Sequence, residues 1–375
     1  MLTLAAFAFW ISVALLGFTF AGYPAVIAWL TRGAQSQEPP FTAQDLTVVV
    51  VCHNESARIL QRIENLLAND YPPGKISILI VSDGSTDDTI AKIEALKNES
   101  VRVIAQSQRS GKAAGLNIGV AACTTPIVVF ADARQTFAAD TIRRLVTRLG
   151  DPEIGAVSGE LEIASTTTGT GSGVDAYWRL ERFIRARESL LDSCIGCTGA
   201  VYAIRRELFL PLPADTVLDD VVIPMRIAVA GRRVVHESTA LAFDPQPLEP
   251  AAEKRRKRRT LAGNFQMLVR HPMWLLPWKN RLWWQLISHK YLRLTGPLLL
   301  ATAFIASALL SHPIYRAALF FQVAFYLLAA FGMILPLRLK VLTLPAAFVF
   351  LNAAVVSAFW DYLTNPDPAR WQTRR

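Results

Sequence analysis

A chain of 375 residues is long enough for one large domain with appendages or for two domains. Its composition is 52% hydrophobic, its formal net charge is +9, and no internal repeat stands out, which argues against a solenoid. A basic chain can be a nucleic-acid-binding protein. The long apolar segments described below instead favour a membrane surface and phosphate-bearing substrates as partners, and they argue against nucleic acid.

The N-terminal residues 1–31 contain no charged side chain. This segment is longer than the roughly 20 apolar residues that cross a bilayer. It also lacks the basic start and the short apolar core of a cleaved signal peptide. We therefore predict a transmembrane anchor that stays on the protein. Arg32 follows directly, and residues 32–44 have the polar, proline-containing composition of a linker.

A β-α-β unit is predicted directly after the linker. The β-branched run Val48–Val51 ends in polar residues that include Glu55, and a helical pattern of apolar residues follows. A second apolar run, Ile76–Val81, ends in an acidic turn that begins with Asp83. The crossover between parallel strands is right-handed, so both polar ends line one crevice. In an open parallel sheet this crevice is where ligands bind.

The alternation of helices and strands continues along the chain. We predict helices at 89–98, 113–122 and 138–149, and strands at 101–105, 126–130 and 154–163, the last with the alternation of an edge strand. Lys112 precedes the second of these helices in the segment QRSGKAAGLN, which lacks the glycine spacing and the Ser or Thr of a P-loop. Asp132 and Arg134 follow an apolar strand, so they also fall at a carboxyl end.

The segment that follows is less regular. We predict a small-residue loop at 165–173, a helix at 174–191, a glycine-interrupted strand at 196–204, a helix at 218–230 and a last strand from Val234. The glycines of the loop do not match G-x-G-x-x-G, because Val174 occupies the last glycine position. Cys194 and Cys197 form a lone C-x-x-C pair, which we interpret as buried thiols in a reducing compartment because a zinc site needs four ligands.

The C-terminal part of the chain contains the remaining membrane elements. Four of the nine tryptophans lie in residues 271–290 with Lys and Arg between them, a pattern typical of amphipathic helices at a bilayer interface, which we place at 266–290. Further spans are expected near 294–311, 314–337 and 341–360, within a membrane region of residues 291–363 that precedes a tail at 364–375. The positive-inside rule places the intervening domain, residues 45–265, in the cytoplasm.

Two segments, VVVVCHNE at 48–55 and NDYPPGKISILIVSDGSTDDT at 69–89, resemble the start of the nucleotide-sugar-binding domain of family-two inverting glycosyltransferases. The resemblance covers roughly residues 45–265 and extends to the membrane-bound cellulose, chitin and hyaluronan synthases. It implies an α/β fold of the A type, with a mostly parallel doubly wound sheet, joined to transmembrane helices. Some other doubly wound nucleotide-binding domain is the alternative.

The resemblance also implies roles for residues that bind the donor. Glu55 and Asp83 match acidic residues that contact the nucleotide, and Lys112 matches a basic segment near the phosphates. Asp132 matches the first residue of the D-x-D motif, which binds Mg²⁺ or Mn²⁺, but Arg134 stands where the second Asp belongs. Either Asp132 holds the metal with help from phosphates and another residue, which we favour, or Arg134 contacts the diphosphate and weakens the metal requirement.

Other matches concern the acceptor and the chemistry. Asp219-Asp220 resembles the acidic pair whose second member, here Asp220, is the general base. The segment with Gly199 and Ala200 resembles the acceptor-side wall. Arg259 matches the Arg of Q-x-x-R-W and would stabilise the leaving diphosphate, but Thr260 replaces the Trp. In polymer-making relatives that Trp lies under the acceptor sugar, so its loss weakens the case for processive synthesis.

These features together predict a multi-pass cell-membrane glycosyltransferase with a cytoplasmic catalytic domain. By the family's habit the donor is a nucleotide sugar of the UDP type. The acceptor is a growing polysaccharide or oligosaccharide, or alternatively a lipid carrier or lipid-linked glycan; the oligomeric state is left open. A transporter is disfavoured because the predicted spans carry few ionisable residues. A non-catalytic nucleotide-sugar receptor is the rival of another class, because it would not need a base at Asp220.

Overall fold

The computed structural model describes residues 2–163, 171–244, 250–335 and 339–364. Within these residues the central feature is an eight-stranded sheet of order β3-β2-β1-β4-β7-β6-β8-β5. Its strands are β1 (Leu46–Cys52), β2 (Ile76–Asp83), β3 (Val101–Gln106), β4 (Ile127–Ala131), β5 (Thr136–Phe137), β6 (Ile154–Ile163), β7 (Val201–Arg205) and β8 (Arg233–Asp244). Strands β1 to β4 pair in parallel, as do β6 and β8, whereas β7 and β5 are antiparallel to their neighbours. The predicted α/β fold with a mostly parallel sheet is confirmed.

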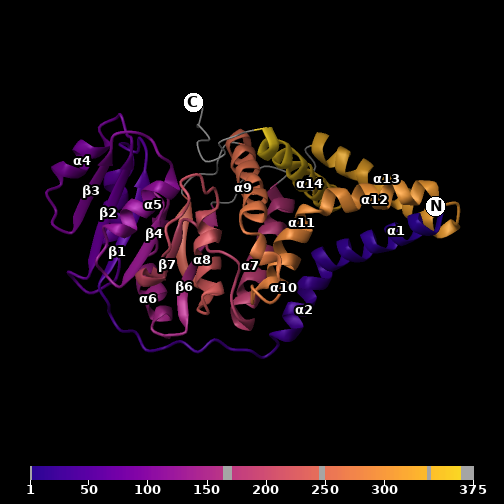
Figure 1. Cartoon of the computed structure of the whole chain (residues 1–375). Helices are drawn as coiled ribbons and strands as arrows, with labels where there is room; N and C mark the ends of the chain where they lie inside the picture. The colour runs from indigo at the N-terminus through magenta and orange to yellow at the C-terminus, as the bar shows by residue number, and fades with distance from the viewer. Residues whose placement is uncertain (1, 164–170, 245–249, 336–338, 365–375) are drawn as a thin grey trace.

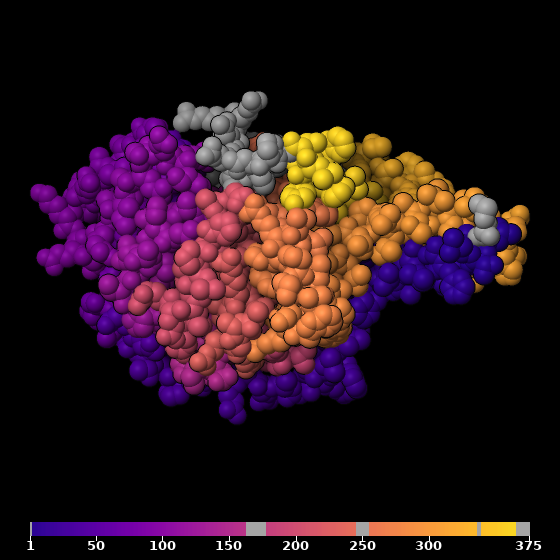
Figure 2. Space-filling model, in the orientation of Figure 1, coloured from indigo at the N-terminus to yellow at the C-terminus, as the bar shows by residue number. Residues whose placement is uncertain are grey.

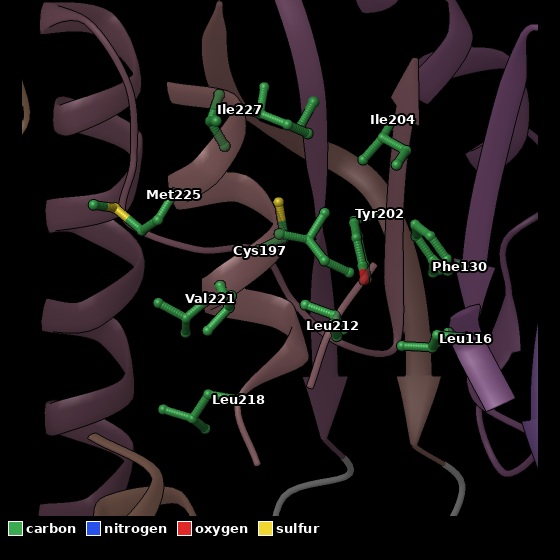
Figure 3. Close-up of a cluster of buried hydrophobic side chains, with 14 of the residues drawn as sticks. Leu116, Phe130, Cys197, Tyr202, Ile204, Leu212, Leu218, Val221, Met225 and Ile227 are labelled. Carbon is green, nitrogen blue, oxygen red and sulfur yellow. The ribbon is translucent and has the colours of Figure 1, made fainter. Parts of the chain in front are cut away.

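Helices cover both faces of this sheet (Figure 1). They are α3 (Ile59–Leu67), α4 (Thr89–Ala95), α5 (Lys112–Ala121), α6 (Thr141–Leu149), α7 (Gly171–Leu191) and α8 (Asp219–Val229), while α9 (Pro250–Arg270) lies beyond α8, beside the apolar helices. Successive side chains of β1 point to opposite faces. Val49 therefore belongs to the buried cluster that includes α5 and α8, part of which is drawn in Figure 3, whereas Val48 and Val50 pack with α3 and α6. Burial on both faces explains why the strands read as continuous apolar runs.

Two glycines allow α5 to lie very close to the sheet. A Cβ atom at Gly115 would lie 2.6 Å from the Val51 side chain, and one at Gly119 would lie 2.7 Å from the Val49 side chain. Side chains at these positions would push the helix away from β1. Because Lys112 is the first residue of α5, this close packing also fixes the distance between Lys112 and the ends of the strands.

Two predictions about the strands are corrected by the structure. Residues 154–163 do form a strand, but β6 lies between β7 and β8 rather than at an edge of the sheet. The strand predicted at 196–204 begins only at Val201, because the preceding residues form a loop in which Gly196 has φ +80°. The predicted loop at 165–173 and the tail at 364–375 lie mostly outside the described residues.

Apolar helices extend away from the sheet on one side of the molecule (Figures 1 and 2). The segment Leu2–Leu30, formed by α1 (Leu2–Gly17), η1 (Phe18–Gly22) and α2 (Tyr23–Leu30), is long and apolar enough to cross a membrane, as are α13 (Pro313–Ile334) and α14 (Lys340–Thr364). Helix α12 (Gly296–Leu309) has only 14 residues, a rise of about 21 Å. It reaches the length of a span only together with Trp283–Leu294, from which it is bent by 60°. The described helices indicate a membrane protein.

The segment predicted as interfacial helices, 266–290, is more buried than that prediction implies. Trp274 is 6% exposed, and Leu282 and Leu286 are fully buried in the cluster that includes α5 and α8. The indole nitrogen of Trp283 donates to the Leu275 carbonyl. Trp278, at 74% exposure, is the tryptophan of this segment that remains available to a bilayer surface. The tryptophans therefore serve mainly to join the membrane helices to the sheet domain.

Candidate active site

The charged residues predicted for the site gather at one edge of the sheet, where β1, β2 and β4 end and α5 and α8 begin. At the centre, Lys112 Nζ lies 3.0 Å from Asp132 Oδ1 and 3.5 Å from Asp219 Oδ2. Desolvation lowers the pKa of Lys112, but Asp132, Asp219 and Asp220 outweigh it and hold the pKa above its ordinary value. We call these four residues the acid–lysine cluster. The sequence placed its members on three separate elements, and the structure brings them together.

Asp83 shapes the loop that leads to this cluster. Its buried carboxylate accepts hydrogen bonds from the backbone N–H groups of Ser110 (2.6 Å) and Gly111 (2.9 Å). Gly84 has φ +66°, and a Cβ atom there would lie 2.6 Å from the backbone nitrogen of Arg109. Asp83 and Gly84 therefore hold the loop directly before Lys112 in place. This structural role was not part of the prediction that Asp83 contacts the nucleotide, and a surface turn is excluded because Asp83 is 4% exposed.

Glu55 lies in the turn after β1, next to the acidic turn after β2. Its backbone N–H donates to Thr89 Oγ1 at 3.0 Å, and its carboxylate pairs with Arg58 at 3.0 Å. Its neighbour Asn54 has φ +55° and accepts a hydrogen bond from the Thr86 N–H. The two turns are thus tied together into one rim of the crevice. The carboxylate of Glu55 remains 23% exposed and accessible to a ligand.

Asp219 and Asp220 form the first turn of α8, where the positive end of the helix dipole favours negative charge. Asp219 is 5% exposed, and within the described structure its buried Oδ2 has no hydrogen-bond partner. Burial and the adjacent Asp219 raise the pKa of Asp220 to about 6, although Lys112 and Lys290 act in the opposite direction. A carboxyl group with such a pKa is suited to take a proton near neutral pH.

The predicted acceptor-side wall lies directly against Asp220. A Cβ atom at Gly199 would lie 2.9 Å from Asp220 Oδ2, so only glycine leaves the carboxylate room. The Cys197 N–H donates to the Asp220 carbonyl at 2.7 Å. Ala200 is 5% exposed and packs into the core rather than lining an open surface. Gly199 therefore borders the Asp220 carboxylate, whereas Ala200 is buried behind this loop.

The two arginines predicted for the donor are arranged differently. Arg134 forms an ion pair with the buried Asp244 at the end of β8, and Gln135 also donates to that carboxylate, at 3.2 Å. Arg259 is exposed on α9, one turn before Gly263, at which a Cβ atom would lie 2.6 Å from Leu218 Cγ. Helix α9 thus borders the site just before Asp219. Arg134 would have to leave Asp244 to bind a diphosphate.

Comparison with known proteins agrees with this geometry. Residues 47–210 match the profile described as "Glycosyl transferase family 2". Residues 47–210 are therefore a glycosyltransferase family 2 region. The matched region includes Glu55, Asp83, Lys112, Asp132 and Gly199, and it ends before Asp219.

Two curated relatives and one solved structure illustrate the similarity. The chain is 24% identical over 249 residues to a poly-beta-1,6-N-acetyl-D-glucosamine synthase of Staphylococcus aureus (strain COL), covering 64% of this chain and 60% of that protein. It is 27% identical over 178 residues to an N-acetylglucosaminyltransferase of Rhizobium meliloti (strain 1021), covering 46% and 41%. The structure of a mannosyltransferase, PcManGT from Pyrobaculum calidifontis, in complex with GDP-Man and Mn²⁺, superposes with a TM-score of 0.73 at 24% identity, covering 96% of this chain and 99% of that one. This likeness confirms the A-type glycosyltransferase fold.

The residues around Asp132 decide what metal this family 2 site can hold. Arg134 replaces the second acidic residue and is paired with Asp244, so Asp132 is the one carboxylate of the motif. In the described part of the chain, no group of three or more His, Cys, Asp or Glu side chains is arranged to hold a metal ion. The Asp132 side chain is 38% exposed and can supply one ligand. The site therefore fits a hard cation that the phosphates of a bound nucleotide also ligate, rather than one held by protein alone.

Sequence reasoning missed two residues that act on the site. Arg62 is buried and stacks on the Phe137 ring at 4.2 Å; its Nε donates to the Asp132 carbonyl at 3.1 Å, and burial lowers its pKa to about 9. Lys290, predicted to face a bilayer, lies 3.6 Å from Glu181 and opposes the rise in the pKa of Asp220. No sequence signal identifies either one, because an Arg on an amphipathic helix and a Lys near a membrane both look solvated.

Proposed function

We propose that the chain is a membrane-bound inverting glycosyltransferase that moves a sugar from a nucleotide sugar to a growing polysaccharide or oligosaccharide. The observation that carries this proposal is the acid–lysine cluster at the carboxyl edge of an A-type sheet. The chain spans about 60% of the length of the curated synthases that it matches, so their substrates support the proposal without extending directly to this chain. The relatives' names favour an N-acetylhexosamine as the transferred sugar, and the family's habit favours UDP as its carrier.

In the reaction that we propose, Asp220 is the general base and accepts the proton of an acceptor hydroxyl. As the proton leaves, the hydroxyl oxygen forms a bond to the anomeric carbon from the face opposite the leaving group. The bond between that carbon and the phosphate oxygen breaks, so the configuration inverts and a nucleoside diphosphate departs. Lys112 is placed to neutralise the charge that develops on the diphosphate. The pKa of Asp220, about 6, keeps it ionised near neutral pH.

The donor side supports this assignment of roles. Glu55 and the turn after Asp83 form the rim on which we propose that the base and ribose lie. Asp132 would share a Mg²⁺ or Mn²⁺ ion with the diphosphate, and the ion would stabilise the departing nucleoside diphosphate. Arg259, exposed on α9 one turn before Gly263, would contact the same leaving group. Full activity in the presence of EDTA would remove the metal from this proposal.

The membrane helices bear on the acceptor. The described chain holds three helices long enough to span a membrane, or four with the bent pair, which is few for a monomeric glycan channel. A lipid carrier or lipid-linked glycan is therefore the second candidate acceptor. The orientation that we propose, with the catalytic domain in the cytoplasm, follows from the basic residues that flank the spans.

Replacement of the base tests the proposed function most directly. Asp220→Asn keeps the shape of the side chain and should bind UDP-N-acetylglucosamine with unchanged affinity while releasing no UDP in the presence of an acceptor. Calorimetric binding and a coupled UDP-release assay on purified protein measure the two properties. Asp45→Asn is the matched control, because Asp45 is 62% exposed and pairs only with Lys75 among the described salt bridges. Wild-type protein that binds the nucleotide sugar and never releases UDP would instead indicate a receptor, and turnover by Asp220→Asn would refute the assignment of the base.

A further inference from the structure

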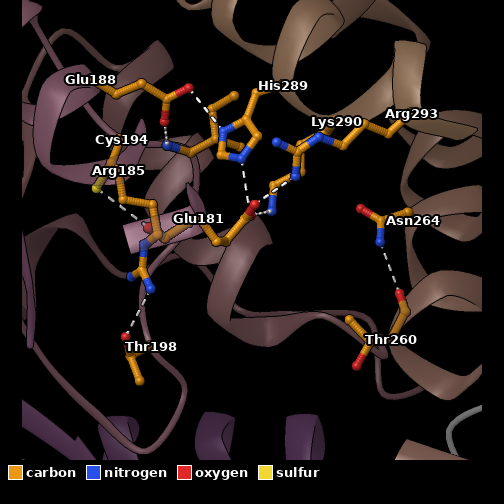
Figure 4. A network of polar contacts seen from close by, with 12 residues as sticks. Glu181, Arg185, Glu188, Cys194, Thr198, Thr260, Asn264, His289, Lys290 and Arg293 are labelled. Atoms are coloured by element: carbon orange, nitrogen blue, oxygen red, sulfur yellow. Dashed lines mark hydrogen bonds and ion pairs between the residues drawn. The ribbon is translucent and has the colours of Figure 1, made fainter. Parts of the chain in front are cut away.

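A second group of charged residues joins the membrane helices to the loop beside Asp220 (Figure 4). Its centre is Glu188 on α7, which is fully buried. On one side, Glu188 Oε1 accepts a hydrogen bond from the Tyr23 hydroxyl at 2.5 Å and lies 2.9 Å from His289 Nδ1. On the other side, its Oε2 accepts from the Ile195 N–H at 3.4 Å. Glu188 therefore contacts the first apolar helix and the active-site loop at the same time.

His289 is itself held in a fixed orientation. It is 0% exposed, and its second ring nitrogen, Nε2, lies 2.9 Å from Glu181 Oε1. Arg293 donates to the other oxygen of Glu181 at 2.5 Å. We call Tyr23, Glu181, Glu188, His289 and Arg293 the junction cluster. Because each member is contacted by another, the position of Glu188 is determined by the membrane-side elements that carry Tyr23 and His289.

The loop of residues 194–199 is fixed to α7 at its other end as well. Arg185, one helical turn before Glu188, donates to Thr198 Oγ1 at 3.1 Å and to Ser158 Oγ at 2.6 Å. Cys197, whose N–H donates to the Asp220 carbonyl, lies between these two attachment points, and Gly199, which borders the Asp220 carboxylate, directly follows the second of them. A displacement of this loop would therefore move the wall against which the base rests.

We propose that Glu188 is a positioning residue that, held by Tyr23 and His289, sets the loop of residues 194–199 against Asp220, so that the first membrane helix contributes to the acceptor side of the active site. This inference rests on the proposed function, because it assigns Asp220 the role of base. Its physical basis is the sensitivity of proton transfer to distance: a displacement of about 1 Å can reduce the rate about 100-fold. A loop that contains Gly196 and Gly199 needs external contacts to keep such a position.

Two substitutions in the full-length protein test the proposal. Tyr23→Phe removes one hydroxyl and leaves the ring packed, and Glu188→Gln replaces one of the two accepting oxygens by an NH₂ group. With UDP-N-acetylglucosamine and an N-acetylglucosamine oligosaccharide, we expect kcat to fall about tenfold for Tyr23→Phe and about 100-fold for Glu188→Gln. The KM for the donor should stay within about twofold of wild type, because the donor side of the crevice is untouched.

Hydrogen exchange provides a readout that does not depend on turnover. The amides of residues 195–199 should exchange faster in Tyr23→Phe than in wild type, while those of β1 and β2 stay unchanged. Tyr326→Phe is the matched control, since Tyr326 lies on a membrane helix and packs by its ring against Phe304 and Phe325. It should match wild type in both exchange and kcat. The double variant Tyr23→Phe/Glu188→Gln should be no slower than Glu188→Gln alone, because both act through the same contact.

The possible results separate this inference from the proposed function. If Asp220→Asn abolishes transfer while Tyr23→Phe has wild-type kcat and wild-type exchange at residues 195–199, Glu188 does not position the loop and the inference is wrong. Additive losses in the double variant also overturn it. If Asp220→Asn retains turnover, the proposed function fails first. If Glu188→Gln does not fold, as judged by size-exclusion chromatography and donor binding, kcat and hydrogen exchange of the conservative Tyr23→Phe variant still test whether Glu188 positions the loop.

Discussion

The acid–lysine cluster and the junction cluster both contact the loop of residues 194–199, and they differ in how completely their carboxylates are hydrogen-bonded. In the junction cluster all four carboxylate oxygens of Glu181 and Glu188 have partners within 3.4 Å. Desolvation would raise the pKa of Glu181, but His289, Arg293 and Lys290 hold it well below its ordinary value. A buried network whose carboxylate oxygens are all hydrogen-bonded makes the surrounding structure rigid.

The acid–lysine cluster has the opposite character. Asp219 Oδ2 is buried without a hydrogen-bond partner in the described structure, and the pKa of Asp220 is raised to about 6. The side chains of Asp132 and Lys112 remain more than a third exposed, so a bound ligand can replace the ion pair between them. Incomplete satisfaction and perturbed ionisation are typical of sites that act on a substrate. Both clusters contain carboxylates around cations. The comparison indicates that the junction cluster has a structural role, whereas the acid–lysine cluster is suited to bind a ligand.

The largest effect that tests this contrast is expected at Lys112. Lys112→Met keeps the length of the side chain and removes the charge that faces Asp132, Asp219 and the predicted diphosphate. We expect UDP release to fall by about 100-fold to 1000-fold, the range found when one preorganised donor to a developing anion is lost. A steady-state assay with UDP-N-acetylglucosamine measures the change.

Lys92→Met is the control for Lys112→Met. Lys92 pairs with Asp88 on the exposed side of α4, at 3.1 Å, and its loss should leave the rate within about twofold of wild type. If Lys112→Met retains wild-type turnover, the acid–lysine cluster is not the reacting site, and the contrast between the two clusters loses its functional meaning.

Stability should respond in opposite directions to neutralisation of one acid in each cluster. Glu181→Gln removes the carboxylate that Arg293 faces and leaves His289 with that of Glu188 alone, so we expect the free energy of unfolding to fall by about 3 kcal/mol, as when a buried ion pair loses one partner. Asp219→Asn removes a buried charge that lacks a hydrogen bond and repels Asp220, while Lys112 keeps its closer partner Asp132, so the same quantity should rise by about 1 kcal/mol at the expense of activity. Thermal unfolding of both variants in one detergent gives the two signs, and equal shifts in one direction would contradict the comparison.

The members of the acid–lysine cluster could be predicted from sequence because each matches a motif of the family that the chain resembles and also lies at the end of a strand or the start of a helix. Asp132, like Asp83 nearby, comes directly after an apolar strand of a parallel sheet, and Asp219-Asp220 precedes an apolar helical pattern. Lys112 opens a helix in the same position relative to the sheet. Local patterns thus place these side chains at one edge, although they do not reveal that Lys112 bridges Asp132 and Asp219.

The junction cluster could not be predicted, because its contacts join residues far apart in the chain. Tyr23 and Glu188 are 165 residues apart, and both lie in segments whose patterns have a simpler interpretation, a membrane anchor and a mixed helix. For the same reason the sequence did not reveal that Arg134 pairs with Asp244, which is 110 residues away. The same reason applies to the edge strand predicted at 154–163, because only the return of β8 covers that side of β6.

The smallest effect concerns pH, and it follows from the raised pKa of Asp220. A base must be ionised to accept a proton, so kcat/KM should be constant above about pH 7. Well below about pH 6 it should fall by about tenfold for each pH unit.

The variant Asp219→Asn tests the cause of this profile. It removes the repulsion from Asp219, which is the second cause of the raised pKa after burial, so the break in the profile should move to lower pH even though the rate itself is reduced. Glu181 of the junction cluster should not contribute to this break, because its pKa lies well below the range. Profiles of wild type, Asp219→Asn and the control Asp45→Asn, measured between pH 5 and pH 8 at constant ionic strength, test both statements. A break that stays in place in Asp219→Asn would mean that the titrating group lies outside the acid–lysine cluster, and the general base would then have to be sought elsewhere in the crevice.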